Sequence, residues 1–142
     1  MNTINKHHSR SQKISGVVSD LLHVYVFWQN NSKHIPKMIR YSMGVKIDSI
    51  FIEIIEMVYL AMFSEPEKRV SLIDKANTKN DLLKFMINAL FELKGVKENV
   101  FVEFSEKLEE IGRRLYGWRN QLIKQNHLDT TKNPELFEKD KK

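Results

Sequence analysis

Residues 101–122, FVEFSEKLEEIGRRLYGWRNQL, carry apolar residues at alternating steps of three and four. This spacing places the apolar side chains on one side of an α-helix over about six turns, which is the pattern of a bundle helix. The apolar positions are Phe101, Phe104, Leu108, Ile111, Leu115, Trp118 and Leu122. A helix this long needs partners of similar length, so we expect the rest of the chain to supply them.

Two helices are expected in the first half of the chain. Residues 15–30 carry apolar residues at helical spacing, although residues 23–28 are β-prone and a strand is an alternative there. The second helix begins at Pro36, which suits a first helical turn, and ends near Phe63. Its centre, SIFIEIIEMVYLAMF, is apolar on more than one side, and such a helix must be covered around most of its girth. Another subunit is a natural source of the extra cover.

The third helix is bounded by two sequence signals. Ser64 opens a Ser-Glu-Pro-Glu segment that matches a capping box with proline in the first turn. Gly95 is a natural residue to follow a helix end. Residues 76–81 are weakly helical, so a kink or break is an alternative there.

Short loops separate these four helices, which favours antiparallel neighbours. The predicted fold class is therefore all-α, an antiparallel up-down four-helix bundle over residues 14–126. Residues 1–13 form a basic N-terminal tail and residues 127–142 a charged C-terminal tail, and both are polar enough to predict disorder.

Composition limits the class of protein. The 142-residue chain is 42% hydrophobic and 29% charged, which is typical of a soluble domain with one core. The absence of Cys excludes disulfides, thiolate metal sites and Cys nucleophiles. The N-terminus lacks the apolar run of a signal peptide, and acids interrupt the most apolar segment, residues 47–63. We expect a cytoplasmic protein with no membrane partner.

Catalysis finds little support in the sequence. The carboxylates of the second and fourth helices lack the Glu-x-x-His pairs of carboxylate-bridged metal bundles. No glycine-rich phosphate loop or nucleophile elbow is present. We therefore expect no catalytic residue, no metal ligand and no cofactor, and a protein that is not an enzyme. A bundle enzyme with a buried metal is the least favoured alternative.

Positive charge gathers in two places. Residues 113–124 hold four Lys and Arg and no acid. Glu109 and Glu110 lie one turn before the first two arginines, so intrahelical pairs account for part of this charge. Cations also flank Pro36, at a helix N-terminus where the dipole disfavours them and where an anion binds well. We expect these cations to converge into one electropositive surface that binds nucleic acid; charge that serves only solubility is the alternative. The residues concerned are Lys37, Arg40, Arg113, Arg114, Arg119 and Lys124.

Several short motifs resemble, in their order and spacing, the "four-helix bundle protein" family. They are Ile35-Pro36-Lys37 with Arg40-Tyr41 and Gly44, then Leu82-Leu83-Lys84-Phe85, then Gly112-Arg113-Arg114-Leu115-Tyr116-Gly117-Trp118, similar to a closing Gly-Arg-x-Leu-x-x-Trp pattern. The family includes proteins encoded in ribosomal RNA intervening sequences and the accessory variability determinants of diversity-generating retroelements. The likeness covers residues 14–124.

The resemblance implies a function as well as a fold. Retroelement members form ring-like homo-oligomers, as pentamers, and bind RNA, or also DNA, together with the element's reverse transcriptase during mutagenic retrohoming. It adds Lys84 to the candidate nucleic-acid-binding residues, although Asn88 stands one turn later where a second cation is expected. The intervening-sequence branch shares the fold, so a structural or protein-interaction bundle with no direct nucleic-acid role is the alternative.

Overall fold

A computed structural model describes the backbone of residues 2–132 and the side chains of residues 16–128. Every regular element in this part of the chain is helical, and it contains no strand. The elements are α1 (Asn2–Ser32), α2 (Lys37–Ile39), the π-helical turn η1 (Arg40–Gly44), α3 (Val45–Phe63), α4 (Pro66–Glu92) and α5 (Glu98–Lys132). The all-α class and the bundle of four long helices are thus confirmed.

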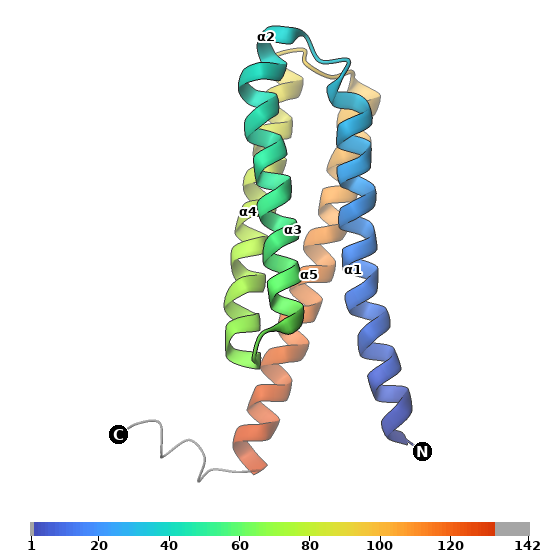
Figure 1. Ribbon diagram of the computed structural model, residues 1–142, viewed down its shortest axis with the longest axis vertical. Helices are drawn as coiled ribbons and strands as arrows, with labels where there is room; N and C mark the ends of the chain where they lie inside the picture. The colour runs from blue at the N-terminus through green and yellow to red at the C-terminus, as the bar shows by residue number, and fades with distance from the viewer. Residues whose placement is uncertain (1, 133–142) are drawn as a thin grey trace, which may run out of the picture.

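The four long helices lie side by side (Figure 1), and some pairs of helices contact each other more extensively than others. α3 packs along α4 and α4 along α5, whereas α1 contacts α5 and α3 less extensively. The connection from α1 to α2 and the connection from α4 to α5 lie at the same end of the bundle, at the top of the view. The turn between α3 and α4 lies toward the other end. No described helix is both long enough and apolar enough to span a membrane.

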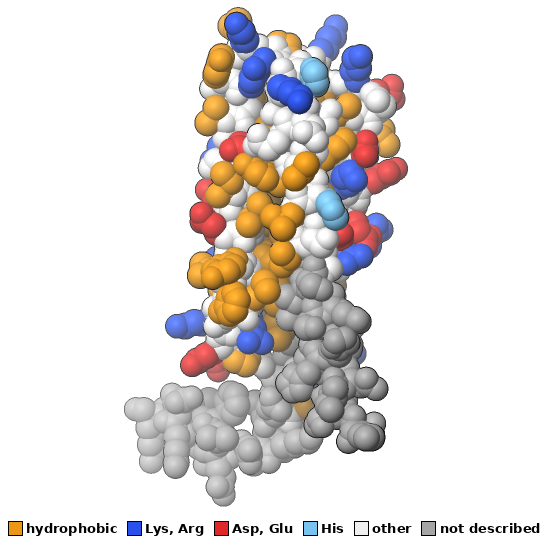
Figure 2. Space-filling view, turned by 45° about the vertical axis from the view of Figure 1, so that its right-hand side comes forward, with side chains coloured by type: hydrophobic (Ala, Val, Ile, Leu, Met, Phe, Trp, Pro, Cys, Tyr) orange, Lys and Arg blue, Asp and Glu red, His pale blue; other side chains and the backbone are white. Residues whose placement is uncertain are grey.

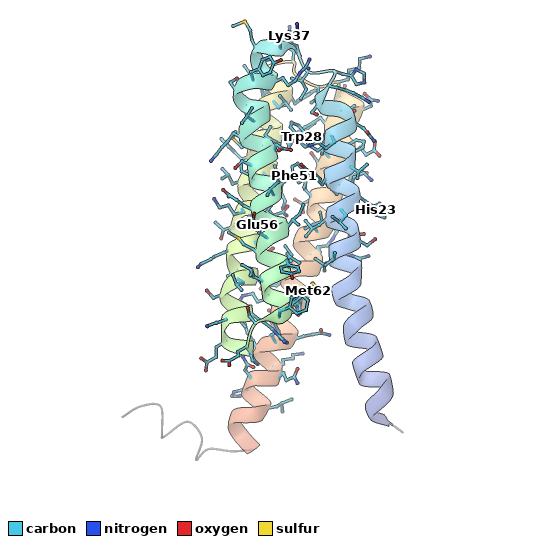
Figure 3. All side chains as sticks on the ribbon, viewed as in Figure 1. His23, Trp28, Lys37, Phe51, Glu56 and Met62 are labelled. Atoms are coloured by element: carbon cyan, nitrogen blue, oxygen red, sulfur yellow. The ribbon has the colours of Figure 1, made fainter. Side chains whose placement is uncertain are left out.

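An aromatic cluster in the core joins three of the helices. Trp28 of α1 stacks on Phe51 of α3 with ring centroids 6.1 Å apart, and Phe104 of α5 lies equally far from Trp28. The labelled Trp28 and Phe51 side chains lie between α1 and α3 in Figure 3. The Trp28 indole N–H donates to Asp48 at 3.2 Å, which satisfies its polar atom at the edge of the core. Residues 23–28 are helical, because burial at helical spacing outweighs their β-propensity.

The apolar stripe predicted for the last helix is buried, except that Phe101 is half-buried and stacks on Phe91. The core also draws on every other long helix. Its largest fully buried side chains are Trp28, Phe51, Phe104, Ile35, Ile47, Ile50, Ile54, Ile73, Leu83, Ile87, Leu90 and Leu108.

The helix expected from Pro36 to Phe63 is present but contains the π-helical turn η1 near its start. The Ser42 hydroxyl donates to the Met38 carbonyl at 2.9 Å within this turn, and the Arg40 guanidinium donates to the Ile35 carbonyl at 3.0 Å. The Ser42 bond satisfies a carbonyl that a wider turn leaves available, and the Arg40 bond satisfies the Ile35 carbonyl just before the helix. Neither bond was visible in the apolar pattern that predicted a regular helix.

The capping box predicted at Ser64 is wrong. α4 begins one residue later than the box requires, with Glu65 rather than Ser64 at the N-cap, and the Ser64 hydroxyl donates back to the Leu60 carbonyl at 2.6 Å, at the end of α3. Glu65 precedes α4 without a side-chain cap, and Pro66 occupies the first turn as expected. α4 then runs without a break through residues 76–81, because Ala76 and Asn80 are buried there and packing outweighs weak propensity.

The helical bounds differ from the predicted domain limits. α1 begins at Asn2, so it includes most of the residues 1–13 that composition assigned to a disordered tail. α5 continues to Lys132, past the predicted limit at residue 126. The remaining part of the predicted C-terminal tail, residues 133–142, lies outside the described residues.

Candidate nucleic-acid interface

The arginine pair at the centre of α5 is held by carboxylates. The Arg113 guanidinium donates twice to Glu110, at 2.9 and 3.2 Å. Arg114 pairs with Asp20 of α1 at 3.0 Å and with Glu110 at 3.2 Å. Hydrogen bonds from Arg114, and then from Arg113, lower the pKa of the Glu110 carboxyl. The intrahelical pairing expected from the sequence is present, although Glu110 serves both arginines.

The two cations between α4 and α5 are also paired. Arg119 forms a hydrogen-bonded ion pair with Asp74 of α4. Lys84 contacts Glu109 of α5 at 2.9 Å, and its hydrogen bond is the main cause of the lowered pKa of that carboxyl. These residues line an open groove of about 670 Å³ whose wall carries acids as well as bases.

The three remaining predicted cations lie apart from this groove. Lys37 is exposed at the end of the bundle that carries the α1–α2 connection, where Figure 3 labels it. Arg40 lies at the same end, half-buried, with its guanidinium on the Ile35 carbonyl. Lys124 is exposed near the opposite end of α5.

The seven predicted residues therefore do not converge into one electropositive surface. Glu98 begins α5 at the end of the bundle where Lys37 and Arg40 lie. Arg113 lies about 22 Å along α5 from Glu98, at roughly 1.5 Å per residue, and Arg119 lies further still. Four of the seven contact carboxylates, and Lys37 and Lys124 lie at opposite ends of the bundle. The expected single surface is replaced by a mixed-charge groove and separate cations.

A different set of cations does come together. The α1–α2 and α4–α5 connections meet at one end of the bundle (Figure 1), and Lys33, Lys94 and Lys97 there join Lys37 and Arg40. We call residues 33–40 and 92–98 the basic end. It holds five Lys and Arg against two acids, Glu92 and Glu98.

The lysines of the basic end are free to bind an anion. Lys33, Lys37, Lys94 and Lys97 are all exposed, and none forms an ion pair with a described residue. Figure 2 shows Lys and Arg side chains gathered around this end, with little acidic surface between them. Sequence reasoning missed Lys94 and Lys97. Their signal was topological: in a bundle with short loops, the first and third connections lie at the same end.

A second surface feature is apolar. Leu22 and Val26 of α1 and Ile52, Tyr59 and Phe63 of α3 are 41–72% exposed, and we call this surface the α1–α3 face. Figure 2 shows hydrophobic side chains running along the boundary of these helices. The Tyr59 and Phe63 rings contact each other at 5.0 Å between centroids. Much of the apolar excess noted for the second helix is thus uncovered in the single chain.

Among the described side chains, no group of three or more His, Asp or Glu is placed to hold a metal ion. No family model matches the chain, and neither a curated protein nor a solved structure does so. The likeness to the four-helix bundle protein family thus remains a resemblance carried by the quoted motifs.

Proposed function

We propose that this protein is a non-catalytic accessory protein that binds nucleic acid, RNA in the first place, through the basic end. The observation that carries the proposal is the meeting of four exposed, unpaired lysines from two connections that are distant in the sequence. An ammonium group that has no carboxylate partner can contact a phosphate without breaking an ion pair. Each such contact releases counterions from the nucleic acid, and this release favours binding.

The paired cations of α5 contribute less in this proposal. A carboxylate contacts each of Arg113, Arg114 and Arg119. A phosphate must therefore compete with that carboxylate for the arginine and is also repelled by its negative charge. The basic end has no such competition within the described residues. The interface is therefore at the end of the bundle rather than along the last helix.

The resemblance extends the proposal to partners and assembly. It implies association with a reverse transcriptase and its template RNA in mutagenic retrohoming, in the cytoplasm, by an antiparallel up-down bundle assembled as a ring-like homo-oligomer. The short connections support the antiparallel order. The exposed α1–α3 face supports contact with a second copy of the chain, since apolar patches of this kind mark interfaces. A ring repeats each basic end and strengthens its field.

The test compares charge reversal at the basic end with charge reversal elsewhere on the molecule. Lys37→Glu combined with Lys94→Glu is expected to abolish binding of a fluorescent RNA oligonucleotide in an anisotropy titration. Lys124→Glu combined with Arg113→Glu makes the same change in net charge away from the basic end and is expected to retain most of the affinity. Wild-type affinity should fall by roughly 0.7–0.9 log units per log unit of salt for each phosphate contacted. A wild type that does not bind RNA, or equal losses in both variants, would overturn the assignment.

A second candidate function is a self-assembling interaction bundle with no direct nucleic-acid role. The α1–α3 face favours it, because Tyr59 and Phe63 on this face stay largely exposed in the single chain. Analytical ultracentrifugation without RNA should then show an oligomer that Ile52→Glu with Tyr59→Glu dissociates. An oligomer that never binds RNA would favour this candidate over the first.

A further inference from the structure

The π-helical turn η1 places an aromatic side chain at the basic end. Tyr41 lies in this turn, one turn after Lys37, and is 71% exposed. Hydrogen bonds from Ser42 and Arg40 to nearby carbonyls hold the turn in shape. Turns of this kind are rare inside helices and are frequent at functional sites.

Packing within the chain does not account for the exposure of Tyr41. Its ring makes no aromatic or cation–π contact and its hydroxyl no hydrogen bond with a described residue, whereas the ring of exposed Tyr59 lies against Phe63 on the apolar α1–α3 face. Tyr116 is 58% exposed, but it lines the mixed-charge groove of α4 and α5. Among the exposed tyrosines that the structure describes, Tyr41 is the one that neighbours unpaired lysines.

We propose that Tyr41 stacks on an unpaired base, so that the basic end prefers single-stranded to double-stranded nucleic acid. This inference rests on the proposed function and specifies the form of its ligand. Positions one helical turn apart bring side chains within about 5–6 Å at Cβ, so Lys37 can contact a phosphate while Tyr41 covers a base of the same strand. Aromatic side chains stack on any of the bases, but only where base pairing does not hide the base face.

Stacking on Tyr41 is not expected to distinguish one base from another. Stacking requires the ring and not the hydroxyl, and it provides no hydrogen bond to a base edge. The site is therefore expected to tolerate many sequences, with affinity set by strand form and salt.

The experiment measures binding of the full chain to one RNA sequence in two forms, a labelled single strand and the same strand in a blunt duplex. Tyr41→Leu, which keeps apolar bulk but removes the ring, should weaken single-strand binding by roughly tenfold and leave duplex binding unchanged. Tyr41→Phe should bind both forms as the wild type does. Tyr116→Leu is the matched control and should also bind normally.

The outcomes separate this inference from the function on which it rests. If the wild type binds neither form, the proposed function fails and the inference with it. If the wild type binds and Tyr41→Leu binds the single strand equally well, the stacking role is overturned and the basic end stands. Equal losses on both forms would also overturn it, because a duplex offers no free base face. Melting curves of each variant confirm that the exposed substitutions leave the bundle folded.

Discussion

The Gly95 amide donates to the Leu90 carbonyl at 2.9 Å, and this bond closes α4 with Lys94, rather than Gly95, in the left-handed conformation. Lys94 has φ = 61°, and its own amide donates to Phe91 at 2.9 Å, which completes a Schellman motif. Gly95 is required for a different reason. A Cβ there would lie 2.5 Å from Cδ1 of Leu90.

Replacing Lys94 with glycine should make the protein more stable and lower its affinity for RNA. The left-handed conformation costs a residue with a Cβ about 1 kcal/mol, so Lys94→Gly is expected to raise the free energy of unfolding by up to that amount. The same change removes one of the four unpaired lysines of the basic end. Denaturant unfolding and RNA anisotropy measure the two effects on one preparation, and unchanged RNA affinity would show that Lys94 is not part of the interface.

The glycines of α5 should respond oppositely to alanine. A Cβ at Gly117 meets nothing within 4 Å, so Gly117→Ala should stabilise the single chain by roughly 0.5–1 kcal/mol through helix propensity. A Cβ at Gly112 would lie 3.3 Å from Nδ2 of Asn80, so Gly112→Ala should gain little or lose stability. Urea titrations of both variants make the comparison. A loss of stability in Gly117→Ala that grows with protein concentration would instead place Gly117 in a contact between subunits.

The helices of this fold are predictable because their burial follows local spacing. The steps of three and four along α5 identified Phe104, Leu108 and Ile111 as core residues, and all three are fully buried. Helix ends are less predictable, because a hydroxyl or an amide has several acceptors within reach. Ser64 lies just before the N-cap residue Glu65 rather than at that position, and its hydroxyl donates backward to Leu60, a difference of one residue that no local pattern predicts.

The candidate site depended on information that lies outside any one helix. Arg119 looked unpaired because Leu115, and not an acid, lies one turn before it, yet Asp74, 45 residues earlier, reaches it from α4. Lys94 and Lys97 looked like ordinary loop residues until the packing of the helices brought their connection beside Lys37. Charge within a segment is visible in the sequence, but charge across a surface requires the topology.

The neighbouring carboxyls of Glu109 and Glu110 should titrate independently of each other. Lys84 is the main cause of the lowered pKa of Glu109, whereas Arg114 and Arg113 lower that of Glu110. Lys84→Met is therefore expected to raise the pKa of Glu109 toward its ordinary value of 4.5 and to leave Glu110 unchanged. Carbon-detected NMR titration of the two carboxyls measures this. A simultaneous shift of both groups would mean that they titrate as one network.

These shifts also set the sign of the pH dependence. Because the folded-state pKa of Glu109 lies below its unfolded value, its pairing stabilises the fold above about pH 4.5, and this stability is lost as the pH falls through the folded-state pKa. Thermal melting should show that Lys84→Met differs from the wild type near neutral pH and converges with it in acid. A difference that persists well below the folded-state pKa would point to lost packing of the lysine stem instead.

Asn80 is expected to hold α4 and α5 in register. Its side-chain amide donates to the Leu108 carbonyl at 3.0 Å, but its Oδ1 atom is buried without a partner in the described residues. Asn80→Ala removes this bond and leaves a small cavity, so we expect a loss of about 1–3 kcal/mol. Asn80→Leu removes the unsatisfied oxygen and keeps the branched shape of the side chain, so it should cost less stability than Asn80→Ala. Urea unfolding gives both free energies, and cross-linking of cysteines introduced on the facing helices reports the register. If Asn80→Leu keeps both its stability and a single cross-linking pattern, the polar group is not needed for register and apolar packing alone aligns the two helices.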